Sequence, residues 1–98
     1  MGEHDEPEGY RGEVTVRVDG QPDRTATAAL VARFDPLAGH VVWTGRISVE
    51  VPTGSRLEIA TAHGAGTAEA IERDVWGNTR VRGVGRPPFP VELLDAPG

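Results

Sequence analysis

The sequence predicts an all-β fold, a small antiparallel β-barrel or sandwich of six to seven strands. From Val41 to Val51 every odd position is apolar or glycine, and every even position except Val42 is polar. A period of two over this length indicates a strand with one buried face. Other alternating segments follow at short spacing with glycine-rich connections, which is typical of antiparallel sandwiches and barrels.

The length of 98 residues predicts one domain. Residues 1–9 are acidic and contain glycine and proline, so we expect a disordered lead-in there. The single β domain is expected to cover residues 10–94, with order beginning at Tyr10. Residues 95–98 are expected to be a tail.

The first half of the domain predicts a hairpin followed by the long strand. Valines alternate over residues 13–18, and Asp19-Gly20 is typical of a tight turn. The return strand covers residues 25–34, and residues 35–39 have turn chemistry. The long strand would reach about 36 Å at ~3.3 Å per residue, so we expect a bend or bulge near Gly45.

The second half predicts strands at 56–61 and 79–84, a turn at 63–66 and a last short extended piece at 91–94. Residues 67–74 are ambiguous: their helix-forming residues follow a threonine cap, but so short a helix with poor apolar spacing is only marginal. Helix and strand both stay open there on pattern alone. The proline-rich segment 86–90 cannot lie inside a sheet.

Composition excludes several classes of function. The net charge of −5 argues against nucleic-acid and anionic-membrane partners. All ten basic residues are arginine and there is no cysteine, which excludes lysine chemistry, P-loops, thiol nucleophiles and disulfides. His4, His40 and His63 lack metal-ligand spacing, so we expect no metal and no cofactor. Without an apolar run or a signal peptide, we expect a cytoplasmic protein.

Three separated motifs carry a family resemblance. They are Phe34-Asp35-Pro36-Leu37-Ala38-Gly39-His40-Val41-Val42-Trp43-Thr44-Gly45-Arg46, Glu72-Arg73-Asp74-Val75-Trp76-Gly77-Asn78 and Gly83-Val84-Gly85-Arg86-Pro87-Pro88-Phe89. From about Tyr10 to Phe89 the chain resembles domain-of-unknown-function family 4873, a bacterial family found as stand-alone proteins and attached to flavin-containing monooxygenase-like proteins. The resemblance favours a strand before Trp76 and implies association with a flavin-dependent monooxygenase. It implies no catalytic residues.

Four residues are candidates for ligand binding. Trp43 lies on the apolar face of the long strand, where a core anchor is the ordinary interpretation and a pocket wall the functional one. Trp76 lies near a strand end, where ligands enter barrels. Arg46 lies on the polar face, so it is either solvated or an anion or flavin-phosphate ligand, and facing away from the core weakens the second interpretation. For Arg86, a structural clamp is the ordinary interpretation and a ligand contact is the functional one.

Two classes of function follow. The first hypothesis is a non-catalytic accessory or ligand-binding module beside a flavin-dependent monooxygenase, binding this protein or a small apolar ligand. The alternative is a small barrel enzyme, an isomerase, cyclase or hydrolase of secondary metabolism, with an acid–base pair such as His40 and Asp74. A cavity of roughly 300 Å³ or more that is lined by Trp43 or Trp76 and contains a buried carboxylate or histidine would favour the enzyme, and a solid interior would contradict it. A third hypothesis is a homodimer that pairs exposed strand edges.

Overall fold

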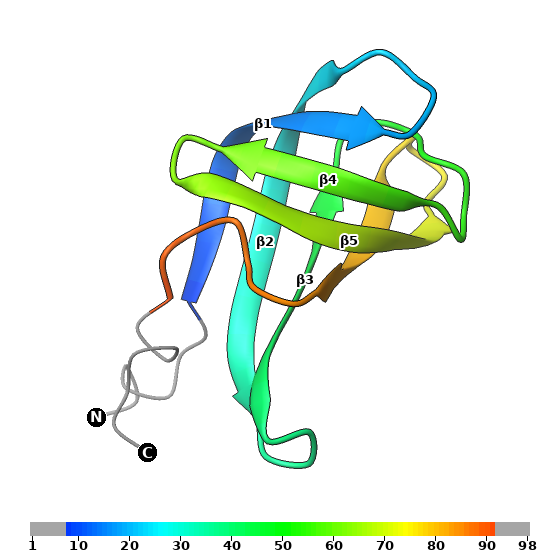
Figure 1. The fold of residues 1–98 in the computed structure, drawn as a ribbon. Helices are drawn as coiled ribbons and strands as arrows, with labels where there is room; N and C mark the ends of the chain where they lie inside the picture. Colours follow the sequence, from blue (N-terminus) through cyan, green and yellow to red (C-terminus); the bar gives the residue numbers. More distant parts are fainter. Residues whose placement is uncertain (1–7, 92–98) are drawn as a thin grey trace.

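Six antiparallel strands alternate buried and exposed side chains and close into a barrel (Figure 1). The computed structural model describes residues 8–91. The strands follow the ring order β1-β2-β3-β6-β5-β4, which joins two three-stranded meanders edge to edge. Their bounds are β1 Glu8–Val18, β2 Arg24–Asp35, β3 His40–Ile47, β4 Arg56–Thr61, β5 Gly64–Arg73 and β6 Thr79–Val84. The all-β prediction is confirmed, and the architecture is a barrel with six strands.

Several predicted boundaries agree with the structure. Strands β4 and β6 begin and end at the predicted residues, and the ambiguous segment 67–74 lies almost wholly in β5. Strand β1 begins at Glu8, two residues before the expected onset of order at Tyr10 and five before the alternating segment predicted at 13–18, because its first residues pair with β2 around Ala32. Residues 1–7 of the expected lead-in, residues 92–94 of the last extended piece and the tail lie outside the described residues.

The long strand predicted over residues 41–51 is shorter in the structure, where β3 ends at Ile47. Ser48 bonds the backbone of β2 in both directions: its N–H donates to the carbonyl of Thr27 at 2.9 Å, and its Oγ accepts from the N–H of Thr27 at 2.9 Å. Beyond this point the buried hydroxyl of Thr79 accepts from the N–H of Val51 at 3.0 Å and donates to the carbonyl of Val49 at 2.8 Å. The period of two continues to Val51 because the chain still packs on the core after leaving the sheet.

The irregularity expected near Gly45 lies elsewhere. Pairing of β3 with β2 and with β6 is continuous through Gly45. The register shifts instead in β5, between Ala70 and Glu72, so Ile71 is the extra residue of a bulge. A Cβ on Gly45 would lie 2.5 Å from the carbonyl oxygen of Ala29, so the glycine serves close strand packing rather than a bend.

The glycines predicted as a turn at 63–66 have a different role. The turn is at Ala62 and His63, and Gly64 to Gly66 already belong to β5. A Cβ on Gly66 would lie 2.9 Å from the carbonyl oxygen of Arg86 and 3.0 Å from Cδ of Pro88. The segment after β6 therefore crosses close over β5, as the orange coil in Figure 1 shows, and buries Phe89 against Tyr10, with ring centroids 6.3 Å apart.

The barrel interior is filled around Trp43. This side chain is 1% exposed, and its register partner on β2 is Ala32, which is fully buried. A Cβ on Gly83 of β6 would overlap the indole, so the ring lies directly on the glycine backbone. The indole Nε1 donates to the carbonyl of Gly85 at 3.1 Å. Small residues on both neighbouring strands thus make room for the largest core side chain.

We expect Gly83→Ala to lower the free energy of unfolding by about 2 kcal/mol, because the added methyl group overpacks the indole. In a Trp43→Leu background the same change should cost much less, because the overlapping ring is gone. Urea unfolding of the two single variants and the double variant measures this coupling. If the losses of unfolding free energy in the two single variants simply add in the double variant, Trp43 and Gly83 do not depend on each other.

Candidate functional site

The inside of the barrel holds no catalytic group. Among residues 8–91 the buried positions are apolar apart from Thr79, and its hydroxyl is used by the backbone of residues 49 and 51. Trp43 packs in the core and lines none of the depressions around Ala29 or the one beside Tyr10 and Ala60. These depressions lie on the outer surface of the barrel.

His40 and Asp74, the predicted acid–base pair, are not brought together. His40 is the first residue of β3, whereas Asp74 follows β5 and approaches Arg46, near the other end of β3. Arg46 lies six positions after His40 along the strand, a distance of about 20 Å at ~3.3 Å per residue. His40 is exposed, and its Nδ1 lies 3.1 Å from the carbonyl oxygen of Val41. No proton can pass directly between the two side chains.

Asp74 organises the β5–β6 turn. Its Oδ1 accepts from the backbone N–H of Trp76 at 2.8 Å and of Asn78 at 3.0 Å, and its Oδ2 accepts from the Asn78 side chain at 3.1 Å. Desolvation raises the pKa of the carboxyl group, but these hydrogen bonds and the Arg46 charge outweigh it. The pKa therefore lies below the ordinary 3.8. A carboxylate held ionised in this way serves the turn and is a poor general acid.

The other two predicted ligand residues are also at the surface. Trp76 is 81% exposed in the β5–β6 turn and lines none of the depressions found on the described chain. Arg86 is exposed, and its contribution to packing is its backbone carbonyl, which lies over Gly66. Neither side chain meets Trp43, Arg46 or the other in a shared pocket.

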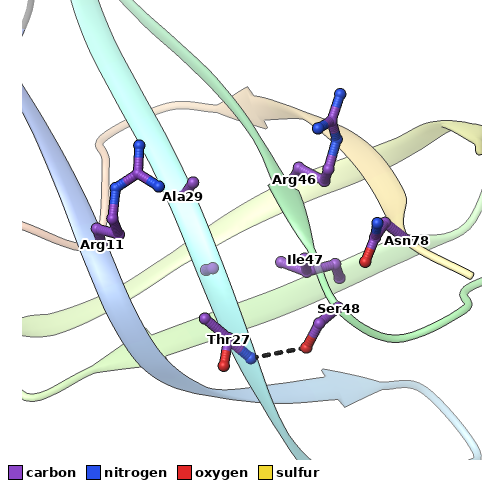
Figure 2. Close-up of a pocket in the computed structure, with 8 residues that line it drawn as sticks. Arg11, Thr27, Ala29, Arg46, Ile47, Ser48 and Asn78 are labelled. Atoms are coloured by element: carbon purple, nitrogen blue, oxygen red, sulfur yellow. Dashed lines mark hydrogen bonds between the residues drawn. The ribbon is translucent and has the colours of Figure 1, made fainter. Parts of the chain in front are cut away.

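Arg46 does lie in a depression on the outer wall. Three depressions meet at Ala29, the outward-facing residue at the middle of β2, and we call this surface the Ala29 furrow. Arg11 and Arg46 flank Ala29 from the two neighbouring strands, as Figure 2 shows. The remaining lining residues include Gly9, Thr27, Val31, Thr44, Gly45, Ser48, Asn78 and Arg80.

The register of the sheet explains this arrangement. Arg11 pairs with Ala29, Ala29 with Arg46, and Arg46 with Arg80, so four outward side chains form one row across β1, β2, β3 and β6. Ala29 leaves a hollow between two long side chains. The hollow between Arg11 and Arg46 measures about 270 Å³, just below the ~300–1,000 Å³ of pockets that enclose small molecules. It suits part of a ligand, such as a head group.

Sequence reasoning singled out Arg46 but missed Arg11 and Ala29. Arg11 lies 35 positions before Arg46 in the chain, and only the strand pairing places both beside Ala29. A two-residue turn at Asp19-Gly20 would have placed Arg11 opposite Ala28, one position away from its observed partner Ala29. The continuation to Arg46 would have needed the second hairpin register as well.

Two further classes of site receive no support from the described chain. Residues 8–91 contain no group of three or more histidine, cysteine or acidic side chains that could hold a metal ion. In the same range no helix has the length and apolar character to cross a membrane.

The fold and its surface define a small antiparallel barrel domain with a filled core and an arginine-flanked outer furrow. The model of the family described as Domain of unknown function (DUF4873) matches residues 7–91. The chain therefore belongs to this family, as the three sequence motifs predicted. No curated protein and no solved structure matches the chain.

The lowered pKa of Asp74 predicts a pH dependence of stability. Because the folded state binds fewer protons there than the unfolded state, the contribution of ionised Asp74 is complete at neutral pH. It is lost as the pH falls from about 3.8 through the lower folded pKa. The stability advantage of the wild type over Asp74→Asn should therefore shrink over this acidic range, as measured by urea unfolding at several pH values.

Asp19→Asn is the matched control, because Asp19 is exposed in a turn and accepts no side-chain hydrogen bond from the described residues. A difference between wild type and Asp74→Asn that stays constant down to about pH 2 would contradict the assignment.

Proposed function

We propose that this domain is a non-catalytic accessory module that binds a flavin-dependent monooxygenase in the bacterial cytoplasm. The observation that carries the non-catalytic part is the barrel core, which among the described residues is an apolar cluster that includes Trp43 and contains no ionisable group. A small apolar ligand would have to bind outside the barrel. The choice of a monooxygenase as partner rests on the family resemblance and its association with such proteins.

The hairpin formed by the ends of β2 and β3 supports docking to another protein. Among the described residues, β1 pairs with β2 as far as Ala32, and β6 pairs with β3 from Thr44 onward. The segment 33–42 therefore extends beyond the barrel as a two-stranded arm, visible at the bottom of Figure 1. On this arm Phe34 is 49% exposed and Leu37 is 98% exposed.

The turn that carries Leu37 is rigidly built. Oδ1 of Asp35 accepts from the backbone N–H of Leu37 at 3.0 Å and of Ala38 at 3.4 Å. Gly39 donates its N–H to the carbonyl of Asp35 at 2.8 Å and adopts a φ of 79°, which favours glycine. A preformed turn loses little conformational entropy on binding, so it suits the presentation of an apolar anchor to a partner's pocket.

No observation favours the alternative enzyme. Its proposed acid and base, His40 and Asp74, lie at opposite ends of β3, and neither faces a cavity lined by Trp43 or Trp76. A homodimer through strand edges has less support in a closed barrel than in an open sandwich, because closure pairs the edges. The two short edges of the arm remain the place where a second copy could pair.

Leu37→Ser should weaken binding of the partner without unfolding the barrel, because the side chain contacts solvent rather than the core. The test is affinity purification of the tagged wild type and the variant from the native host, followed by mass spectrometry. We expect a flavin-dependent monooxygenase with the wild type only, and binding weakened by at least about tenfold in a titration of the purified pair.

Thr53→Ser is the matched control at an exposed turn on another part of the barrel. Recovery of the barrel protein alone, or equal recovery of the monooxygenase by all three proteins, would overturn the proposed contact. Sedimentation of the purified domain as a dimer that Leu37→Ser dissociates would assign the arm to self-association instead.

A further inference from the structure

We propose that the Ala29 furrow binds the phosphate group of a phosphate monoester between Arg11 and Arg46, with the organic part of the ester on the floor of the furrow. This inference goes beyond the proposed function, because it concerns the wall of the barrel rather than the hairpin arm. The two surfaces can be tested separately.

Unused hydrogen-bond donors are the first support. Each guanidinium carries five N–H donors, and neither Arg11 nor Arg46 donates a hydrogen bond to any residue in the range 8–91. Arg17 shows the contrast: its guanidinium bonds both oxygens of Asp23 at 3.0 Å and reaches Glu58 at 2.9 Å. The carboxylate nearest to Arg46, that of Asp74, lies 3.8 Å from its Nε, outside hydrogen-bond distance.

The distribution of charge is the second support. Arg46 and Arg80 are direct cross-strand neighbours, a like-charge arrangement that destabilises a sheet. The acidic groups nearby are only partly able to compensate. Glu72 pairs with Arg80 at 3.3 Å, and Asp74 is held by the N–H groups of its turn. Arg11 has no ion pair with any described residue, although Glu13 lies two positions further along the same face.

The spacing of the two arginines fits a single anion. They lie on either side of Ala29, so their backbones are two strand spacings apart, about 10 Å. In Figure 2 the two side chains flank Ala29, and both guanidinium groups extend toward the top of the view. Two long side chains over this span can reach one phosphate and bond its oxygens, and arginine matches phosphate geometry with paired N–H groups.

The floor of the furrow indicates an ester rather than a free anion. Gly9, Ala29 and Val31 continue the hollow beside Arg11, and Val31 is 37% exposed. At the other end the hydroxyl of Ser48 accepts from Thr27 and keeps its own proton free to donate. An organic group attached to the phosphate would cover the apolar surface of Ala29 and Val31, which adds to affinity.

The experiment is an NMR titration of the ¹⁵N-labelled domain with phenyl phosphate, with inorganic phosphate and phenol as comparison probes. We expect saturable shifts of the backbone amides of Ala29, Arg46 and Ser48, and tighter binding of phenyl phosphate than of either comparison probe. Arg11→Gln and Arg46→Gln should each weaken binding by about tenfold or more, because each removes charge-assisted hydrogen bonds.

Two further variants separate a built site from general attraction of anions. Arg33→Gln removes an exposed arginine of the same strand as Ala29 but outside the furrow, and should leave the affinity unchanged. Ala29→Leu fills the hollow without changing the charge and should weaken binding as much as loss of an arginine.

Shifts that do not saturate, equal weakening by Arg33→Gln, or undiminished binding to Ala29→Leu would each overturn the proposal. A Leu37→Ser variant should bind phenyl phosphate normally, so failure of this site and failure of hairpin docking give different results.

Discussion

The packing of Trp43 against Gly83 is the contact on which the rest of the barrel depends. The ring lies on the bare backbone of β6, and Ala32 gives it room on β2, so the largest core side chain fits between small neighbours. Its Nε1 also bonds the carbonyl of Gly85, where the chain leaves the sheet. The same residue therefore fills the interior and fixes the start of the segment that carries Phe89 and Val91 into the core.

A filled interior has a direct consequence for function, because recognition is left to the outward-facing residues. Strand periodicity places Arg11, Ala29 and Arg46 outward in one row, while in the range 8–91 only β2 and β3 pair along the arm at 33–42. The first surface offers charge beside a hollow, and the second offers an apolar anchor on a rigid turn. They are separate in position and in chemistry, so the two proposed contacts can be tested independently.

Local patterns predicted the fold well, since burial alternates along every strand. The bounds of β4 and β6 and the core position of Trp43 followed from period and turn chemistry alone. The end of β3 did not, because it depends on contacts of Ser48 with Thr27 and of Thr79 with Val49 and Val51, each across more than twenty residues. The bulge at Ile71 was missed for the same reason.

The site was less predictable than the fold because it depends on register between distant strands. Arg46 was identified as an outward-facing arginine. The furrow in which it lies also needs Arg11 and Ala29, which no local sequence pattern connects to Arg46. His40 and Asp74 were grouped by chemistry alone, and the structure places them at opposite ends of β3. Asp74 has a structural role, because its carboxylate accepts hydrogen bonds from the backbone N–H groups of the turn that follows it. The sequence Asp-Val-Trp-Gly-Asn is typical of such a turn.

The central claim, that the barrel has no internal binding site, is tested most directly by methyl NMR of the wild-type domain during titration with benzene. Small apolar molecules enter dry cavities lined by aliphatic side chains when such cavities exist. The account predicts no saturable shift of the methyl groups of Ile47 and Ile59, which are fully buried beside Trp43 in the core. Saturable shifts of these methyl groups would contradict this claim, because they would show that the inside of the barrel binds small molecules.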